Sequence, residues 1–399
     1  MASLLKDKRI VLGVTGSIAC YKAADLASKL TQEGALVDVV MTNAAQEFIA
    51  PLTFTSLTHR PTITAMFDHN SPQAIQHVFL AHEADILVIA PATANVIAKL
   101  THGLADDMLT ATALATRAPI LIAPAMDANM YEAQPTQENV DRLRCRGVTI
   151  VGPAVGRMAS GHVGRGRMVE VSELVETILI ALGRNGDLAG RHIVVTAGGT
   201  QEPLDPVRAV TNRSSGKMGY AIAQAARDRG ASVILISAPT ALPAPVGVQV
   251  INIMTAAEMR DAVSKAVPKC DALIMAAAVA DYRPAKFSQQ KLKKGDETWS
   301  LEMVKTADIL NEVQGNFVKV GFAAETENVL ENAREKLAKK HLHLIVANDV
   351  TDPEGGFASD RNRVILVDDK GGVETLPLLS KYEVAHHILD KVVKLITSR

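Results

Sequence analysis

Short apolar runs alternate with helical patterns along the first half of the chain. The runs are rich in Val, Ile and Leu, as expected of strands buried on both faces. They lie at residues 9–16, 36–42, 84–93, 118–126 and 147–154. The stretch at 17–34 has helical periodicity and ends at Gly34, which suits a C-terminal cap. Continuous apolar strands separated by helices predict a parallel sheet covered by helices on both faces.

The same alternation begins again after a short polar stretch rich in glycine, GRNGDLAGR. A strand and a glycine turn at 191–200 lead into a helix that ends at Gly230, and a helix at 381–396 closes the chain. We therefore predict two Rossmann-like α/β domains, residues 1–183 and 191–399, joined by a linker at 184–190. The polar tract FSQQKLKKGDE, from residue 287, is predicted to be a mobile loop.

Charge and composition narrow the classes of function. Of 399 residues, 42 are Lys or Arg and 43 are Asp or Glu, and only 4% are aromatic. A nucleic-acid surface would need clustered basic charge, and often stacking aromatics. No apolar run approaches the roughly 18 residues of a membrane span, no signal peptide is recognisable, and the three cysteines are scattered. We expect a cytoplasmic protein that binds small molecules, with neither nucleic acid nor membrane as partner.

Glycines and polar side chains follow the predicted strands of the first half. The turn after the first strand leads into a helix N-terminus, whose N–H groups suit an anion; an ordinary strand–helix turn is the alternative. Ligands of open α/β sheets bind at the carboxyl ends of strands. The prolines that follow the third and fourth strands are also common at strand ends without any ligand. The residues that would meet at this edge are Gly16, Ser17, Thr42, Thr93, Asn95, Asp127 and Asn129.

Two further features of the first half have alternative interpretations. His77 precedes a buried strand; it suits a general base because histidine titrates near neutral pH, but a partly buried histidine capping a helix explains it as well. The segment 156–168, GRMASGHVGRGRM, is rich in glycine and arginine. It is either a lid over a site or a disordered connection.

Together, GVTGSIACYKA, His77 followed by PATAN, PAMDANM and the glycine-rich segment resemble the homo-oligomeric flavin-containing cysteine decarboxylases. The resemblance covers essentially residues 5–180 and implies a flavodoxin-like fold. It implies that FMN lies between subunits of a trimer and oxidises the Cβ–S unit of a cysteinyl substrate. The resulting thioaldehyde would stabilise the carbanion as CO2 leaves, and the reduced flavin would return its electrons to the enethiolate.

The resemblance also implies roles for individual residues of this chain. His77 would be the active-site base. The implied FMN residues are Gly16, Ser17, Thr42, Pro91, Ala92, Thr93, Asn95 and Met126. The implied substrate residues of this half are Asn95, Asp127, Asn129 and Met130.

Two positions depart from the family pattern. Asp127 stands where the family has asparagine, and Ser160 stands where it has a proton-donating cysteine. A serine hydroxyl is a far weaker acid than a cysteine thiol. We expect Ser160, or a nearby water, to deliver the proton. The alternative is an active ligase whose FMN-binding first half is impaired in the reductive step or serves as a scaffold.

The second half carries two groups of residues suited to phosphate. Gly199 follows a strand, and TNRSSGKMG starts a helix with Ser214, Ser215, Gly216 and Lys217, whose hydroxyls and N–H groups suit phosphate oxygens; an ordinary N-capped helix is the alternative.

Another strand ends in small residues and then Asp281, which can hold a ribose hydroxyl or a metal. Lys291, in KLKK, is either a solvated charge or part of a flap that closes on a triphosphate.

These motifs, with TAGGTQEPLDPVR and GFAAET, occur in the order found in phosphopantothenate–cysteine ligases, so the whole chain resembles a bifunctional family of coenzyme A biosynthesis. The resemblance implies that the carboxylate of 4'-phosphopantothenate attacks CTP, forms an acyl-cytidylate and releases pyrophosphate. The cysteine amine then displaces CMP. A non-catalytic flavoprotein regulator is a further alternative, against which the intact constellation between residues 212 and 340 argues.

The resemblance also implies roles for individual residues of this half. Asn212 would turn the intermediate over, Lys291 would support its formation, and Arg208 and Asn212 would contact substrate. The implied CTP residues are Gly199, Ser214, Ser215, Gly216, Lys217, Ala277, Asp281, Lys291, Asp308, Ile309, Leu310, Phe322, Lys336 and Lys340. Mg2+ is expected at Asp281. Trimeric decarboxylase and dimeric ligase contacts would build a dodecamer.

Overall fold

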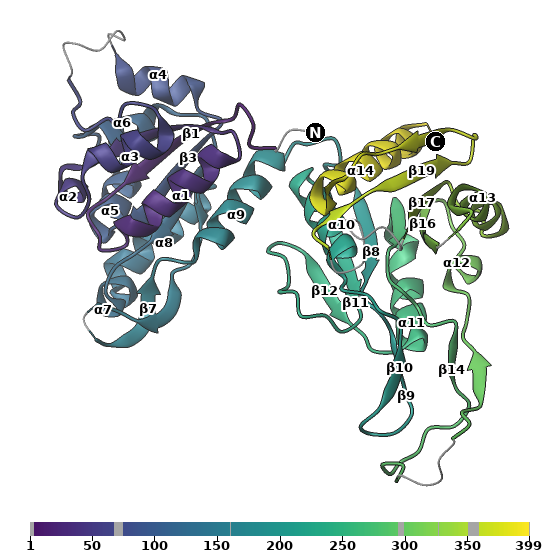
Figure 1. Ribbon diagram of the computed structural model, residues 1–399. Coiled ribbons are helices and arrows are strands. Elements are labelled where there is room, and N and C mark those ends of the chain that lie inside the picture. The colour runs from purple at the N-terminus through teal and green to yellow at the C-terminus, as the bar shows by residue number, and fades with distance from the viewer. Residues whose placement is uncertain are drawn as a thin grey trace. The chain divides into compact units, whose positions relative to one another are not determined.

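The computed structural model describes residues 4–67, 75–159, 161–293, 299–325, 327–349 and 359–398. The chain packs as two compact units, which meet in the sequence between Leu182 and Gly183 (Figure 1). Across the described ranges, no helix is long and apolar enough to cross a lipid bilayer.

The first unit is built on a five-stranded parallel sheet with the order β2-β1-β3-β4-β5. Its strands are β1 Arg9–Val14, β2 Leu36–Met41, β3 Ile86–Ala92, β4 Ile120–Pro124 and β5 Thr149–Ile150. Its helices are α1 Cys20–Gln32, α2 Asn43–Gln46, α3 Pro51–Thr58, α4 Gln76–Glu83, α5 Ala94–His102, α6 Met108–Ala115, α7 Ala128–Glu132, α8 Gln134–Cys145 and α9 Val171–Gly183. This is the flavodoxin-like order, which opens a crevice between β1 and β3 at the carboxyl edge.

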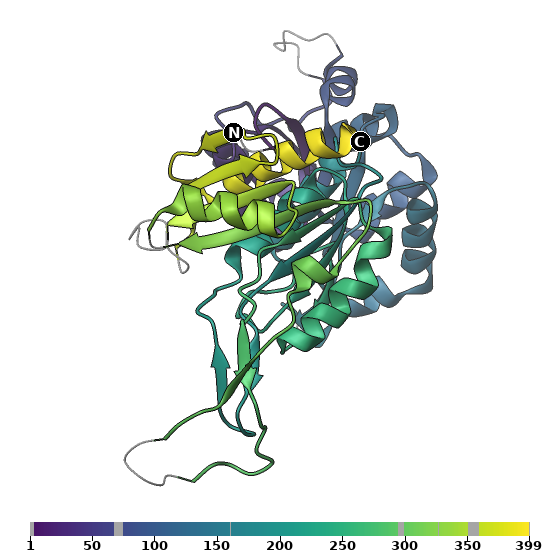
Figure 2. The same ribbon diagram turned by 90° about the vertical axis from the view of Figure 1, so that its right-hand side faces the viewer.

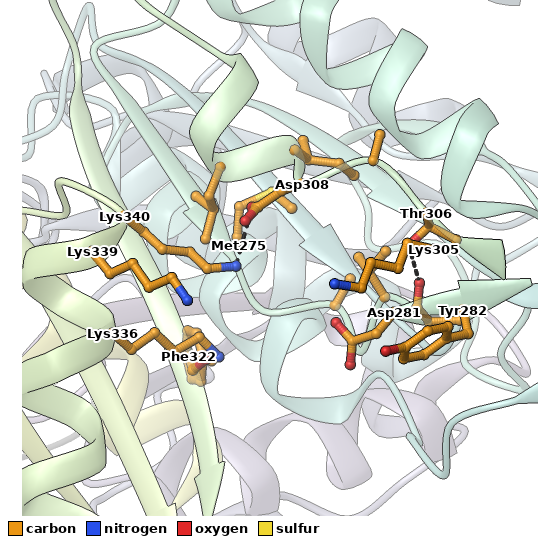
Figure 3. A pocket seen from close by; sticks show the side chains of 16 residues that line it. Met275, Asp281, Tyr282, Lys305, Thr306, Asp308, Phe322, Lys336, Lys339 and Lys340 are labelled. Carbon is orange, nitrogen blue, oxygen red and sulfur yellow. Dashed lines mark hydrogen bonds and ion pairs between the residues drawn. The ribbon is translucent and has the colours of Figure 1, made fainter.

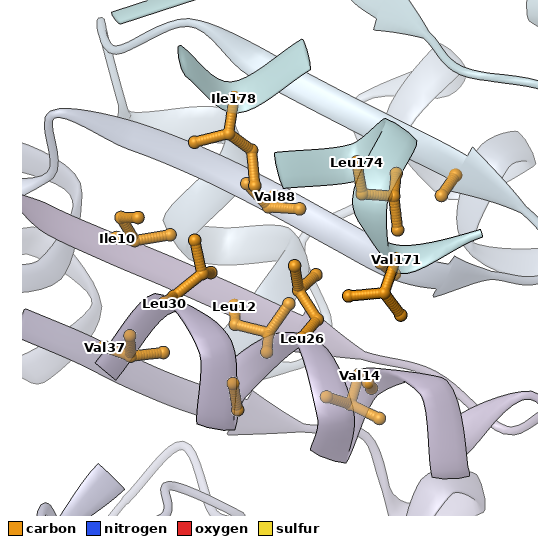
Figure 4. Close-up of a cluster of buried hydrophobic side chains, with 14 of the residues drawn as sticks. Ile10, Leu12, Val14, Leu26, Leu30, Val37, Val88, Val171, Leu174 and Ile178 are labelled. Carbon is orange, nitrogen blue, oxygen red and sulfur yellow. The ribbon is translucent and has the colours of Figure 1, made fainter. Parts of the chain in front are cut away.

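Helices cover both faces of this sheet, as the continuous apolar strands predict. On one face, Leu26 and Leu30 of α1 and Leu174 and Ile178 of α9 pack against the strands with no exposed surface (Figure 4). A second buried cluster on the sheet includes Ile97 of α5. Leucine and isoleucine at helical spacing on α1 and α9 therefore fix these helices to the sheet.

The glycine-rich segment forms an antiparallel hairpin, β6 Ala154–Arg157 with β7 Val163–Arg167. Its backbone joins the turn after β4, because Met126 N donates to Gly166 O at 3.0 Å. A Cβ on Gly166 would lie 2.2 Å from the Met126 carbonyl oxygen, so only glycine allows this approach. Of the two alternatives above, the disordered connection is wrong for the described part of this segment.

The second unit has an eight-stranded sheet with the order β12-β11-β8-β13-β16-β17-β19-β20. The first six strands are parallel, in the Rossmann order, while β19 pairs antiparallel with β17 and β20 pairs antiparallel with β19. The strands are β8 His192–Ala197, β11 Ser232–Ser237, β12 Gln249–Asn252, β13 Ala272–Met275, β16 Val318–Glu325, β17 Leu344–Asp349, β19 Val364–Asp368 and β20 Val373–Thr375. The predicted fold class, two Rossmann-like α/β units, is thus confirmed.

Helices and three small strand pairs complete this unit. The helices are α10 Lys217–Asp228, α11 Ala256–Ala266, α12 Ile309–Glu312, α13 Val329–Lys339 and α14 Lys381–Thr397. The pairs are β9 Gln201–Pro203 with β10 Ala209–Thr211, β14 Tyr282–Pro284 with β15 Met303–Lys305, and β18 Arg361–Asn362 with β21 Leu379–Ser380. The first two pairs form an arm that extends from the rest of the unit (Figure 2).

A buried histidine of α14 makes the stability of this unit depend on pH. His386 is 6% exposed, and burial, with the positive charge of Arg229 nearby, lowers its pKa to about 4. In the unfolded chain His386 takes up a proton near pH 6.5, whereas in the folded chain it does so only near pH 4. The free energy of unfolding therefore decreases as pH falls from about 6.5 towards 4. Between pH 7 and pH 5 we expect a loss of about 2 kcal/mol.

Urea unfolding of wild type and His386→Gln, followed by circular dichroism at both pH values, measures this loss. The variant is expected to lose about 2 kcal/mol less than wild type over that interval. Equal losses in the two proteins would contradict the assignment.

Candidate functional site

A threonine joins two turns at the carboxyl edge of the first sheet. Thr15 Oγ1 donates to Pro91 O at 2.7 Å and accepts from Thr93 N at 3.0 Å. The turn after β1 therefore lies against the turn after β3. Gly16 packs closely against the start of α2, since a Cβ on it would lie 2.6 Å from Ala44 Cβ.

The hydroxyl of Thr42, at the end of β2, is buried without a hydrogen-bond partner among the residues that the structure describes. A buried polar atom without a partner costs about 1–3 kcal/mol, so native structures normally pair it. Thr42 is two residues before Ala44, which lies against Gly16. A bound group with hydroxyl or phosphate oxygens would satisfy it, which fits the phosphate and ribityl chain of a flavin nucleotide.

A cavity of about 370 Å³ opens at the same edge, between α1, the turn after β4 and the β6–β7 hairpin. Ser17, Met126 and Asp127 line it, as the sequence predicts of a shared crevice. Asp127 accepts from Asn129 N at 3.0 Å and caps α7.

Other predicted residues of this half do not line that cavity. His77 is half-buried in the first turn of α4. The residues outside the cavity wall are Gly16, Thr42, His77, Pro91, Ala92, Thr93, Asn95, Asn129 and Met130. Ser160 lies outside the described residues, so its expected role stays a prediction.

Three apolar side chains at the cavity are missing from the sequence interpretation. Ile18, Tyr21 and Phe48 line it and are 63%, 62% and 51% exposed. Large apolar side chains gathered around a pocket mark a surface that a ligand or another chain covers. The signal was present in the sequence, because Ile18 and Tyr21 are apolar positions off the buried stripe of the 17–34 helix.

In the second unit, hydrogen bonds between neighbouring strand ends build the site. Thr196 Oγ1 accepts from Ala277 N at 3.1 Å, Ala278 N donates to Gly198 O at 2.8 Å, and Thr200 Oγ1 accepts from Ala280 N at 2.9 Å. The turn after β8 and the small-residue segment after β13 therefore run side by side.

Asn212 is held across these two segments. Its Nδ2 donates to Val279 O at 3.1 Å, and no described residue donates to its Oδ1. A Cβ on Gly199 would lie 2.5 Å from Asn212 O, so glycine is required for this approach. Gly199 thus allows the backbone of Asn212 to approach closely, but it lines neither of the two cavities at this edge.

Two adjoining cavities, of about 490 and 480 Å³, open at this edge. They share Ala277, Val279, Asp281, Phe322 and Lys336. Figure 3 shows the first, with Asp281, Tyr282 and Lys305 on one side and the lysines of α13 on the other. The second is lined by the segment from Asn212 to Gly219, which leads into α10 and includes Ser214, Ser215, Gly216 and Lys217.

The first cavity holds a cluster of lysines with defined partners. Lys340 Nζ lies 3.1 Å from Asp308 Oδ1, and Lys336 Nζ donates to Phe322 O at 2.8 Å. Burial lowers the pKa of Lys336, and the charge of Lys340 lowers it further. Ile309 and Leu310 complete the wall. Positive charge that is partly buried in this way suits an anionic ligand.

Besides Gly199, two predicted residues line neither cavity. Arg208 Nη2 binds Asp205 Oδ2 at 2.7 Å and Leu292 O at 2.6 Å, so it holds the backbone next to Lys291 against the arm. Lys291 is exposed and lines neither cavity. The flap interpretation of Lys291 stays a prediction, as does the mobile loop, of which residues 294–298 lie outside the described ranges.

Within the described ranges, no group of three or more His, Cys, Asp or Glu side chains could hold a metal ion. Mg2+ is commonly held by one or two carboxylates together with substrate phosphates. Asp281, which lines both cavities, is compatible with a site of that kind but not with an all-protein cage.

Several lining residues were not predicted from the sequence. Asn348, Asn362 and Lys381 line the second cavity, and Lys305 and Lys339 line the first. One signal was available, because LHLIVAND ends an apolar strand with a polar amide at Asn348. Nothing in the sequence places Asn362 and Lys381 at the same cavity.

Comparison with known proteins extends over both units. Residues 2–183 match the family model described as Flavoprotein, and residues 188–396 match that of the DNA/pantothenate metabolism flavoprotein C-terminal domain. The coenzyme A biosynthesis bifunctional protein CoaBC of Bacillus subtilis (strain 168) is 44% identical over 98% of each chain. That of Vibrio vulnificus (strain YJ016) is 46% identical over 97% of this chain and 98% of its own.

A crystal structure of the C-terminal domain of a CoaBC protein is 41% identical and covers 54% of this chain and 100% of its own, with a TM-score of 0.47. Since the relatives that are 44% and 46% identical extend over nearly the whole chain, and the two family models match its two halves in order, the chain belongs to the family of coenzyme A biosynthesis bifunctional proteins CoaBC.

Proposed function

We propose that this chain makes 4'-phosphopantetheine in two steps. Its second unit joins cysteine to 4'-phosphopantothenate at the expense of CTP, and its first unit decarboxylates the product with FMN. The observation that carries the proposal is the pair of adjoining cavities at the carboxyl edge of the second sheet, with Asn212 in the wall of the second and hydrogen-bonded to Val279, which lines both. Full-length similarity to bifunctional relatives favours both reactions over the alternative of an impaired or scaffolding first unit.

In the ligation, the residues of the second unit would bring two anions together. A carboxylate and a triphosphate repel each other, so their approach needs fixed positive charge. Lys336, Lys340 and Lys217 supply it, with the N-terminus of α10. We assign the nucleotide to the first cavity and the phosphorylated acid to the second, with the reacting carboxyl group at Asn212. CTP and Mg2+ at Asp281 are part of this proposal.

In the decarboxylation, FMN would supply the reversible oxidation of the substrate. Ser17 and the unpartnered Thr42 hydroxyl suit the phosphate and ribityl groups, while Met126 and the apolar side chains at the cavity suit the ring. The β6–β7 hairpin, joined to Met126 through Gly166, would exclude water from the bound substrate. His77 is the proposed base, and Asp127 and Asn129 remain proposed substrate residues.

Exposed apolar side chains support the proposed assembly of several copies. Ile18, Tyr21 and Phe48 surround the flavin-site cavity, and Val207, Phe287 and Trp299 on the arm are 64%, 54% and 59% exposed. Two such patches on different units suit two kinds of contact between copies, as a dodecamer built from trimers and dimers requires. A cytoplasmic location stays a prediction.

Mass spectrometry of one reaction mixture tests the proposed function. Purified protein with 4'-phosphopantothenate, cysteine, CTP and Mg2+ is expected to give 4'-phosphopantetheine, CMP, pyrophosphate and CO2. Omission of cysteine should stop the reaction at the acyl-cytidylate. Accumulation of the oxidised, decarboxylated thiol would instead support the impaired alternative, and absence of pyrophosphate would refute the ligase.

A further inference from the structure

One wall of the second cavity comes from the C-terminal part of the chain. Asn348 of β17 pairs with Val364 of β19, and Asn362 of β18, two residues earlier, pairs with Leu379 of β21. Lys381 begins α14, two residues after Leu379, and its N–H donates to Asp360 O at 3.0 Å. Three neighbouring elements therefore bring Asn348, Asn362 and Lys381 to the same cavity.

The two asparagines each present an unsatisfied acceptor. Asn348 is 9% exposed and Asn362 is 5% exposed, and the Oδ1 atom of each is buried without a partner among the described residues. Such an atom costs about 1–3 kcal/mol. Two of them in one cavity wall indicate a ligand that donates N–H or O–H hydrogens there. Phosphate oxygens, which act as acceptors, do not meet this need.

Lys381 adds a buried positive charge to the same wall. It is 7% exposed, and its Nζ donates to Ser359 O at 2.5 Å. Burial lowers the pKa of this amine to about 8. Among the described residues that line the cavity, Asp281 alone is acidic, while Arg213, Lys217, Lys336 and Lys381 are basic. The wall thus combines acceptors for N–H groups with a cation for a carboxylate.

An amino acid carries both of these groups on one carbon atom. We propose that Asn348, Asn362 and Lys381 form the cysteine subsite: the two amide oxygens accept from the α-amino group, and the Lys381 ammonium binds the α-carboxylate. This assignment rests on the ligation proposed above. Asn212 lines the same cavity, which adjoins the first at Ala277, Phe322 and Lys336, so an amine bound here would share a cavity with the acyl group held at Asn212.

Neutral amides suit this role better than carboxylates. A carboxylate beside the amine would raise the pKa of the amine and keep it protonated, whereas only the free amine can attack. In the reaction, the N–C bond forms and the acyl C–O bond to the cytidylate breaks. CMP leaves with that electron pair, and the amine releases one proton to water.

The two half-reactions can be measured separately, which isolates the subsite. Pyrophosphate release from 4'-phosphopantothenate and CTP needs no cysteine, whereas CMP release from the preformed acyl-cytidylate does. We expect Asn348→Leu, Asn362→Leu and Lys381→Met to raise the KM for cysteine at least about tenfold. Pyrophosphate release and the KM values for CTP and 4'-phosphopantothenate should stay within about twofold of wild type. Asn185→Leu, at the exposed start of the second unit, is the matched control.

A substrate analogue gives a readout that loss of packing would not move. Cysteamine has the amine and thiol of cysteine but no carboxylate, so wild type should use it less efficiently. In Lys381→Met, kcat/KM for cysteine is expected to become nearly equal to kcat/KM for cysteamine. An unchanged ratio would overturn the role of Lys381.

Other outcomes point to other occupants or to a failure of the parent proposal. A rise in KM for CTP or 4'-phosphopantothenate, with that for cysteine unchanged, would mean that substrate hydroxyl or phosphate groups occupy this wall, and would overturn the subsite. A wild-type protein that forms no acyl-cytidylate would refute the ligation itself. The three variants report independently, so poor folding of one, seen by circular dichroism, leaves the other two to decide.

Discussion

Replacement of His77 by Asn is expected to slow decarboxylation by about 100- to 10,000-fold, the range typical of a lost general base. Asparagine keeps a polar side chain of similar reach but cannot take up a proton near neutral pH. His77 lies in the first turn of α4 and lines no described cavity of its own chain, so bound FMN should be unaffected. Release of CO2 and the visible flavin spectrum measure the two effects.

His82→Asn, on the exposed side of the same helix, is the matched control and should retain normal rates. Normal decarboxylation by His77→Asn would remove His77 from its proposed role. Coexpression with Gly166→Val adds a test of assembly, because that substitution would separate the hairpin from the Met126 turn. If His77 serves the cavity of a neighbouring copy, mixed oligomers of the two inactive variants should regain part of the activity.

Replacement of Asn212 by Asp is expected to make the acyl-cytidylate accumulate. The amide Nδ2 donates to Val279 O, and a carboxylate would face that carbonyl oxygen with no proton to donate. The new negative charge would also hold the incoming amine in its protonated form. Pyrophosphate release should persist while amide formation falls by roughly 100-fold, which mass spectrometry of quenched mixtures would show.

The exposed Asn252 at the end of β12 offers a control, since Asn252→Asp makes the same chemical change outside both cavities. Parallel losses of pyrophosphate release and amide formation, without a detectable intermediate, would place Asn212 in the first half-reaction instead. Together with the cysteine-subsite variants, this experiment separates groups that position the acyl carbon from groups that position the amine.

Most of the fold follows from local patterns. The Val, Ile and Leu runs coincide with β1, β2, β3, β4 and β8, because a strand buried on both faces needs an apolar side chain at every position. Gly34 and Gly230, at helix ends, adopt φ values of +87° and +91° that glycine accepts readily. The hairpin at 154–167 escaped prediction because its glycines leave few side chains to alternate.

The sequence by itself also determined which segments carry chemistry, since glycine turns and polar residues after apolar strands converge at the carboxyl edge of any parallel sheet. Only the tertiary structure decided which of those residues share a cavity. It brought Asn212, Lys336, Asn348 and Lys381 to the wall of one cavity, and it left Arg208 and Lys291 on the arm. A cavity wall and an unsatisfied buried oxygen are created by contacts between segments far apart in the chain, so no local pattern encodes them.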